Sequence, residues 1–227
     1  IWDPATDTFL DRGYEQMSFQ RGKAACKKAL QKELGLEENK DLVLAGVVSR
    51  LDQQKGLDVL LRSAPDFLDK MQFVVLGSGD PGLSDAFAAL AAKHPKRVAF
   101  RSGFDEELAH RIYGGADVFV MPSRFEPCGL SQMIAMRYGA LPVVTRTGGL
   151  KDTVFYNGEP KDSSGFAIDY ADDCQLRSIL GHIVSLYGWR ENWNMMVRNA
   201  MRGDYAWGKS AEAYLKLFAI ASQRRQL

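Results

Sequence analysis

The chain carries a series of short, uninterrupted apolar runs, and their spacing constrains its fold more than any other feature. The runs lie at Leu42–Val48, Phe73–Leu76, Val98–Phe100, Val118–Met121 and Leu141–Thr145. Runs of this kind are typical of strands that are buried on both faces of a parallel sheet. Stretches rich in helix-forming residues separate them or precede them, at Arg21–Leu34, Leu57–Asp69, Leu83–Lys93, Glu106–Tyr113 and Leu130–Tyr138. This alternation predicts an α/β fold with a doubly wound, Rossmann-like parallel sheet.

The C-terminal part of the chain has a different pattern, because helical stretches follow one another without strands between them. After a sixth short strand at Gly165–Ile168, three helices are predicted at Leu176–Tyr187, Glu191–Met201 and Trp207–Ser222. The closing Arg224 and Arg225 are expected to be a solvated tail. Since no repeat, low-complexity segment or linker divides the sequence, residues 1–227 are predicted to form one domain with a helical C-terminal extension.

The overall charge balance limits the ligands that the chain can recognise. Its 227 residues carry 29 basic and 28 acidic side chains, a net charge of +1. Nucleic-acid-binding proteins normally show a basic excess or stripe, so no nucleic-acid partner is expected, and any anion must be met by a few placed cations. No apolar run approaches the ~20 residues that span a bilayer, so no membrane partner is expected. The cysteines, Cys26, Cys128 and Cys174, include no C-x-x-C pair and fit a reducing compartment.

The segment Ser49–Gly56 (SRLDQQKG) follows the first strand, at the sheet edge where open α/β sheets bind their ligands. Arg50 and Lys55 in this segment are suited to grip a diphosphate from two sides, since Arg offers a planar fork and Lys a mobile point charge. A helix that begins near Gly56 adds the positive end of its dipole. The alternative is a pair of solvated surface cations, which is the commoner fate of an Arg–Lys pair.

The segment Pro122–Ser131 (PSRFEPCGLS) follows the fourth strand and combines a carboxylate with a helix start. Pro127 disfavours helix at Glu126, so the carboxylate is presented from extended backbone. Gly129 is expected to open a helix whose first N–H groups, with the Ser131 hydroxyl, receive phosphate oxygens. A carboxylate beside such an anion site accepts hydrogen bonds from sugar hydroxyls. The alternative, equally supported by this segment alone, is a charge that is favourable to the helix dipole.

Two more loops at this edge contain glycines. The loop Leu76–Gly82 includes Gly77 and Gly79 but lacks the third glycine of a dinucleotide fingerprint, so we interpret it as a close-approach turn that grazes a nucleotide. The loop Arg146–Leu150 is either a ligand-facing nest or a turn. No D-x-D pair and no histidine or cysteine cluster with metal-ligand spacing is present, so no metal is expected. Cys128 is far in sequence from every histidine and is expected to be a buried structural thiol.

Several of these segments resemble the bacterial glycogen synthase and plant starch synthase family. Val48–Asp58 (VSRLDQQKGLD) resembles the family's donor loop, Pro122–Gln132 (PSRFEPCGLSQ) resembles its most distinctive motif, and Arg146–Val154 (RTGGLKDTV) continues the likeness. Trp2–Asp7 resembles the segment that follows the family's interdomain crossover, and Trp207–Ala211 is similar to a segment near its end. The resemblance covers nearly the whole chain in register.

The resemblance implies a fold and an activity. The family has the glycosyltransferase-B fold, and this chain corresponds to its C-terminal, donor-binding half. Members transfer glucose from ADP-glucose, or from UDP-glucose in some cases, to the non-reducing end of an α-1,4-glucan with retention of configuration. No cofactor is implied. The implied compartment is the cytoplasm if the source is bacterial and the plastid stroma if it is a plant.

The resemblance also implies roles for matching residues. Arg50 and Lys55 would hold the diphosphate, and Glu126 would contact and orient the donor glucose. Phe104 stands where the family places an aromatic that stacks on adenine; Tyr is common there, and Phe keeps the π-face without the hydroxyl. The phosphate and ribose site would be lined by Gly129, Leu130 and Ser131.

The sequence departs from the family in one large respect, since the N-terminal acceptor domain and its glycine-rich, Lys-containing motif are not in it. The isolated chain is therefore expected to bind donor without turnover. Wider retaining relatives have a second Glu eight residues after the position of Glu126, and here that place is Ile134, as expected for synthases. The alternatives are a nucleotide-sugar-binding module without activity, and another retaining transferase of this fold, such as a sucrose or trehalose-phosphate synthase type.

Overall fold

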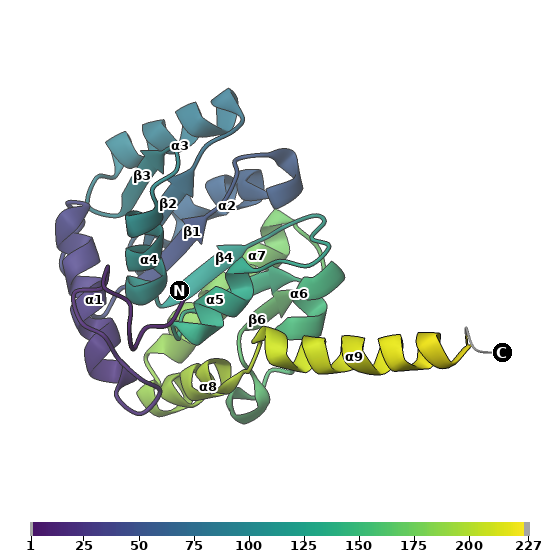
Figure 1. Cartoon of the computed structure of the whole chain (residues 1–227). Coiled ribbons are helices and arrows are strands. Elements are labelled where there is room, and N and C mark those ends of the chain that lie inside the picture. The colour runs from purple at the N-terminus through teal and green to yellow at the C-terminus, as the bar shows by residue number, and fades with distance from the viewer. Residues whose placement is uncertain (1, 225–227) are drawn as a thin grey trace.

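The computed structural model of the chain describes residues 2–224, apart from the side chains of Lys209 and Arg224. Its centre is a parallel sheet of six strands in the order β3-β2-β1-β4-β5-β6 (Figure 1). The strands are β1 (Val43–Val48), β2 (Met71–Gly77), β3 (Val98–Ser102), β4 (Val118–Met121), β5 (Leu141–Thr145) and β6 (Phe166–Ile168). The chain moves outward from β1 to β3 and then returns to place β4 beside β1, so the carboxyl ends of β1 and β4 form the topological switch point. The predicted doubly wound sheet is confirmed.

Helices cover both faces of this sheet. They are α1 (Phe19–Glu33), α2 (Leu57–Ser63), α3 (Pro81–Lys93), α4 (Glu106–Gly115), α5 (Ser131–Arg137), α6 (Gly148–Thr153), α7 (Asp173–Tyr187), α8 (Arg190–Arg202) and α9 (Trp207–Arg224), with short 3₁₀ turns η1 (Gln53–Lys55), η2 (Ala64–Phe67) and η3 (Pro160–Asp162). Successive strand side chains point to opposite faces. Leu44 and Phe119 accordingly lie in a cluster with α1, α4 and α5, whereas Val43 and Val118 lie in one with α2, α3, α7 and α8.

The predicted helix Leu57–Asp69 is divided in the structure into α2 and the 3₁₀ turn η2. Pro65 lies at the start of η2. Its ring removes a backbone donor and clashes with the preceding turn, so an α-helix cannot continue through it undisturbed. The interruption shortens α2 to 7 residues, or about two turns, directly after the loop that follows β1.

The three predicted C-terminal helices are present but differ in their packing. Ile183 of α7 and Trp193 of α8 are buried in the main core, so these helices belong to the body of the domain. Only α9 is an extension, and Figure 1 shows it projecting away from the sheet. No helix of the described residues is long and apolar enough to cross a membrane. The side chain of Arg224 and the whole of Arg225 lie outside the described residues, so the solvated tail stays a prediction.

Candidate active site

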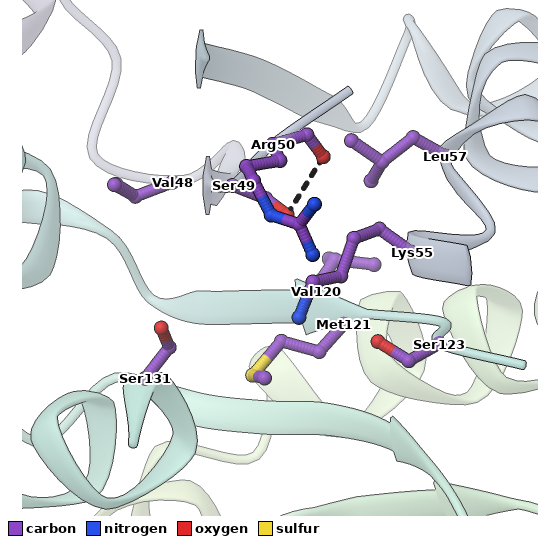
Figure 2. A pocket seen from close by; sticks show the side chains of 9 residues that line it. All are labelled: Val48, Ser49, Arg50, Lys55, Leu57, Val120, Met121, Ser123 and Ser131. Carbon is purple, nitrogen blue, oxygen red and sulfur yellow. Dashed lines mark hydrogen bonds between the residues drawn. The ribbon is translucent and has the colours of Figure 1, made fainter. Parts of the chain in front are cut away.

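A pocket of about 210 Å³ opens at the carboxyl ends of β1 and β4. Arg50 and Lys55 reach it from the loop after β1, and Ser131 lies across from them at the start of α5 (Figure 2). The structure thus brings together three residues that the sequence placed in two separate loops. The complete lining is Val48, Ser49, Arg50, Lys55, Leu57, Val120, Met121, Ser123 and Ser131.

Lys55 is joined directly to Glu126. The Lys55 ammonium lies 2.6 Å from Glu126 Oε2, and the two side chains are only 19% and 9% exposed. The sequence assigned these residues to different parts of one ligand and did not predict that they form an ion pair. Ser123 is buried below them, and its hydroxyl lies 3.5 Å from the same carboxylate oxygen. Glu126 is therefore presented beside the pocket with its charge balanced.

Arg50 pairs with Asp52, at 2.9 Å between Nη1 and Oδ2, but its side chain is 70% exposed. Exposed ion pairs contribute only about 0–1 kcal/mol because water screens them. Arg50 is therefore free to exchange Asp52 for an anionic ligand at little cost. The shielded Lys55–Glu126 pair is the more persistent of the two.

The backbone around Lys55 is fixed by local contacts. Asp52 caps η1, since its Oδ1 accepts a hydrogen bond from the Lys55 N–H at 3.0 Å. Gly56 follows with φ +65°, and a Cβ there would lie 1.9 Å from the carbonyl oxygen of Pro122. Only glycine fits this conformation and this approach. The loop after β1 and the loop after β4 are thereby held in backbone contact.

The loop Arg146–Leu150 supports Glu126 from behind. The Gly149 N–H donates to the carbonyl oxygens of Glu126 and Pro127, both at 3.2 Å. A Cβ on Gly148 would lie 1.9 Å from the Glu126 carbonyl oxygen. The sequence left two interpretations of this loop open, a ligand-facing nest and a turn. A turn that packs against the backbone of Glu126 accounts for both glycines.

The predicted phosphate and ribose residues differ from expectation in one detail. Helix α5 begins at Ser131, whereas Gly129 was expected to open it. Gly129 has φ +76°, outside the right-handed helical region, and its carbonyl oxygen accepts a hydrogen bond from Gln132 Nε2 at 3.0 Å. Leu130 is exposed between them. Contact of Gly129, Leu130 and Ser131 with a donor stays a prediction.

The remaining predicted nucleotide contacts do not line the pocket. Gly77 and Gly79 are at a close-approach turn, as predicted, but a Cβ on either would meet the chain's own Ser49 or Leu51 carbonyl oxygen, at 1.9 and 2.3 Å. This packing by itself accounts for the glycines. Phe104 lies just beyond β3 and is 91% exposed, so its ring face is available for stacking. Its contact with adenine stays a prediction.

Cys128 was expected to be buried, and this prediction was wrong. Its side chain is exposed. A Cβ on Gly149 would lie 2.2 Å from the Cys128 carbonyl oxygen, so the backbone at Cys128 packs against α6 and the thiol points elsewhere. Among residues 2–224, no group of three or more His, Cys, Asp or Glu side chains gathers where it could hold a metal ion.

Two charged residues of the site, Asp58 and Arg124, were given no role by the sequence. The Arg124 guanidinium contacts both Asp58 carboxylate oxygens, at 2.7 and 2.8 Å. These hydrogen bonds lower the pKa of Asp58 to about 2. The available signal was that Asp58 follows β1 and Arg124 follows β4, and these two strands are neighbours in a doubly wound sheet.

Comparison with known families identifies the chain at the family level. Residues 42–183 match the family described as "Glycosyl transferases group 1". The chain belongs to this family. It is 48% identical over 219 residues to the glycogen synthase of Elusimicrobium minutum, covering 96% of the chain and 45% of that protein. The glycogen synthase of Syntrophotalea carbinolica is 44% identical over 226 residues, which cover 97% of the chain and 46% of that protein. The chain thus spans about half the length of the curated relatives it matches.

Solved structures agree with this assignment. The catalytic domain of starch synthase IV from Arabidopsis thaliana, bound to ADP and acarbose, has a TM-score of 0.89 at 37% identity. The match covers 96% of this chain and 46% of that catalytic-domain chain. The C-terminal domain of a group 1 glycosyl transferase from Francisella tularensis (LpcC) has a TM-score of 0.63 at 17% identity. The match covers 79% of this chain and 92% of that domain, and at this identity it shows a shared fold alone. The family resemblance and the glycosyltransferase-B type of fold, both predicted from the sequence, are confirmed.

Proposed function

We propose that this chain is the donor-binding half of a retaining glucosyltransferase that moves glucose from ADP-glucose to the non-reducing end of an α-1,4-glucan. The convergence of Arg50 and Lys55 on one pocket, with Glu126 held beside Lys55, carries the proposal. It is supported by 44–48% identity to two glycogen synthases and by the ADP bound to the starch synthase of similar structure.

The two cations match the charge that develops in such a reaction. When the bond between the anomeric carbon and the phosphate oxygen breaks, negative charge grows on the leaving diphosphate. Fixed cations therefore stabilise the transition state more than the ground state. Arg50 gives up a weak, exposed contact with Asp52 to meet the diphosphate, whereas Lys55 can contact phosphate while it continues to orient Glu126. Glu126 in turn accepts hydrogen bonds from the glucose hydroxyls.

The other predicted residues complete the donor site in this proposal. Phe104 stacks on the adenine ring, and Gly77 and Gly79 pass close to the nucleotide. Gly129, Leu130 and Ser131 line the phosphates and the ribose. The protein's cations neutralise the diphosphate, without metal or cofactor. The glucan acceptor binds through the acceptor domain that the family carries before its donor-binding half.

The compartment is part of the same proposal. We expect the cytoplasm of a bacterium, or the plastid stroma of a plant. All three cysteines are free in the structure, with Cys128 and Cys174 exposed. Free, exposed thiols persist most readily in a reducing compartment, which both locations provide.

A calorimetric titration of the full chain tests the donor site. We expect ADP and ADP-glucose to bind with and without EDTA, and no glucose transfer to maltooligosaccharide by the chain alone. Arg50→Ala and Lys55→Ala should each weaken ADP binding, while Lys28→Ala, an exposed lysine outside the pocket, should not. Binding of UDP without ADP would contradict the proposed donor, and binding of neither nucleotide would contradict the site.

A further inference from the structure

Arg124 connects the two loops that carry the predicted donor residues, yet it does not line the pocket. Its backbone N–H donates to the Gln54 carbonyl oxygen at 2.8 Å. Its Nη1 donates to the Gln53 carbonyl oxygen at 2.7 Å. In return, Gln54 Nε2 donates to the Phe125 carbonyl oxygen at 2.9 Å. The residues directly before Lys55 are therefore tied to the residues directly before Glu126, across the gap between the loops.

The Arg124 side chain ends in a two-pronged contact with Asp58. Both carboxylate oxygens are engaged, at 2.7 and 2.8 Å, and the side chains are 37% and 28% exposed. Asp58 lies in the first turn of α2, three residues after Lys55. Arg62 contacts the same carboxylate at 3.1 Å from the next turn of the helix. Because hydrogen bonds from Arg124 and Arg62 lower the pKa of Asp58 to about 2, the carboxylate stays charged near neutral pH.

The geometry of this contact is suited to fixing a distance. A planar guanidinium that binds both oxygens of a carboxylate restrains orientation as well as separation. Lys55 and Glu126 also join the loops, but an ammonium is a single point charge on a flexible stem. The Lys55–Glu126 pair therefore attracts the loops without setting their relative position.

We propose that Arg124 is a positioning residue which, through Asp58 and the Gln53 carbonyl, sets the spacing between the cations for the diphosphate and the carboxylate for the glucose. This inference rests on the proposed function. In a nucleotide sugar the diphosphate and the glucose are covalently joined, so both contacts form together only when the two loops stand at the matching distance. A misplacement of ~1 Å in such an arrangement can cost ~10²-fold in rate.

The two ligands ADP and ADP-glucose separate positioning from general stability. ADP engages the cations without needing Glu126, whereas ADP-glucose engages both loops. Arg124→Lys keeps the charge and removes the fork. We expect it to raise the ratio of the ADP-glucose Kd to the ADP Kd about tenfold in the full chain. Asp58→Asn should raise this ratio similarly, and the double variant should add little to either single change, since residues that act as one pair are not additive.

Arg111→Lys is the matched control. Arg111 Nε lies 3.0 Å from Glu33 Oε2, with side chains 23% and 39% exposed, and it joins α4 to α1 instead of the donor loops. Its Kd ratio should stay at the unmutated value. Thermal unfolding of each variant reports whether the chain is folded, and Arg124→Gln serves if Arg124→Lys unfolds.

The outcomes are distinguishable. If the unmutated chain binds both ligands and the ratio is unchanged in Arg124→Lys, the positioning role is wrong and the proposed function stands. An equal loss of both affinities would assign Arg124 a general structural role and also overturn the inference. If the unmutated chain binds neither ligand, the proposed function fails and this inference fails with it.

Discussion

Arg50 and Lys55 are both cations with an acidic neighbour, but the two ion pairs differ in their access to water. The Arg50–Asp52 pair is exposed and is therefore weak. The Lys55–Glu126 pair is shielded, so removing either partner leaves a desolvated charge without its counter-charge. The two cations at the edge of this pocket thus differ in how strongly an acidic partner holds each of them.

We expect Lys55→Ala to lower turnover about 10²–10³-fold in the complete enzyme that includes the acceptor domain, because a preorganised charge at a developing anion contributes about 3–4 kcal/mol. Lys55→Ala should also lower the free energy of unfolding, since Glu126 loses its partner. Adding Glu126→Gln should restore much of that stability but not the turnover. Steady-state kinetics and urea unfolding measure the two effects.

The control and the contradicting results for this prediction are specific. Lys28→Ala removes an exposed lysine that lies 3.8 Å from Glu38 and should change neither quantity. Near-normal turnover in Lys55→Ala would remove Lys55 from the donor site. Glu126→Gln alone keeps the side-chain shape, so unchanged kinetics in that variant would exclude its contact with glucose.

At this scale, the sequence predicted that some of the candidate residues gather but not how they pair. Arg50, Lys55 and Ser131 share the pocket because parallel strands end at one edge of the sheet. The contact between Lys55 and Glu126 spans 71 positions. It depends on β4 lying directly beside β1, which apolar runs alone do not specify. The Arg124–Asp58 contact was missed for the same reason.

At the scale of elements, the strands were predictable because they are apolar. The start of β2, where a polar residue is buried, shows the limit of that signal. The run predicted at Phe73–Leu76 is part of the longer strand β2, which begins at Met71. Gln72 interrupts the apolar pattern but is fully buried, since Gln31 Nε2 donates to its Oε1 at 2.7 Å and its own Nε2 donates to the Glu37 carbonyl oxygen at 2.8 Å. A buried amide is tolerated when its partners are present, and the partners are distant in sequence.

The contact between α6 and the loop after β4 predicts a difference between two glycines. Gly148 and Gly35 both have positive φ, +43° and +71°, so alanine at either should cost about 1–2 kcal/mol in backbone strain. A Cβ at Gly35 meets nothing within 4 Å, whereas at Gly148 it meets the Glu126 carbonyl oxygen at 1.9 Å. Gly148→Ala should therefore destabilise the chain more and displace Glu126.

Urea unfolding and an ADP-glucose titration check this expectation. Gly35→Ala should bind ADP-glucose like the unmutated chain, because neither Gly35 nor α1 contributes to the pocket lining. Gly148→Ala should bind it more weakly at a temperature where both variants are folded. Equal stability and equal affinity in the two variants would show that the loop after β4 does not depend on α6.

At the scale of the whole molecule, the core and the site occupy the same body, and α9 stands outside it. The buried core extends through α7 and α8, where Ile183 and Met201 lie within it, but none of the α9 side chains that the structure describes belongs to it. The large exposed apolar residues of α9 are Trp207, Tyr214, Leu215, Leu217, Phe218 and Ile220. Its aromatic rings pack against one another along the helix. The ring centroids of Trp207 and Tyr214 are 6.2 Å apart, and those of Tyr214 and Phe218 are 6.1 Å apart.

This separation predicts that the body is stable without α9. A chain that ends at Ala206 should unfold at the same urea concentration as the full chain and bind ADP equally well, because no core or pocket contact is lost. It should also self-associate less in sedimentation experiments, since a large exposed apolar face promotes association.

A chain that ends at Gly203 is the informative comparison. It also loses Tyr205, whose hydroxyl donates to the Thr153 carbonyl oxygen at 3.1 Å, and should be less stable. A lower midpoint for the chain ending at Ala206 would mean that α9 stabilises the fold through contacts with the body.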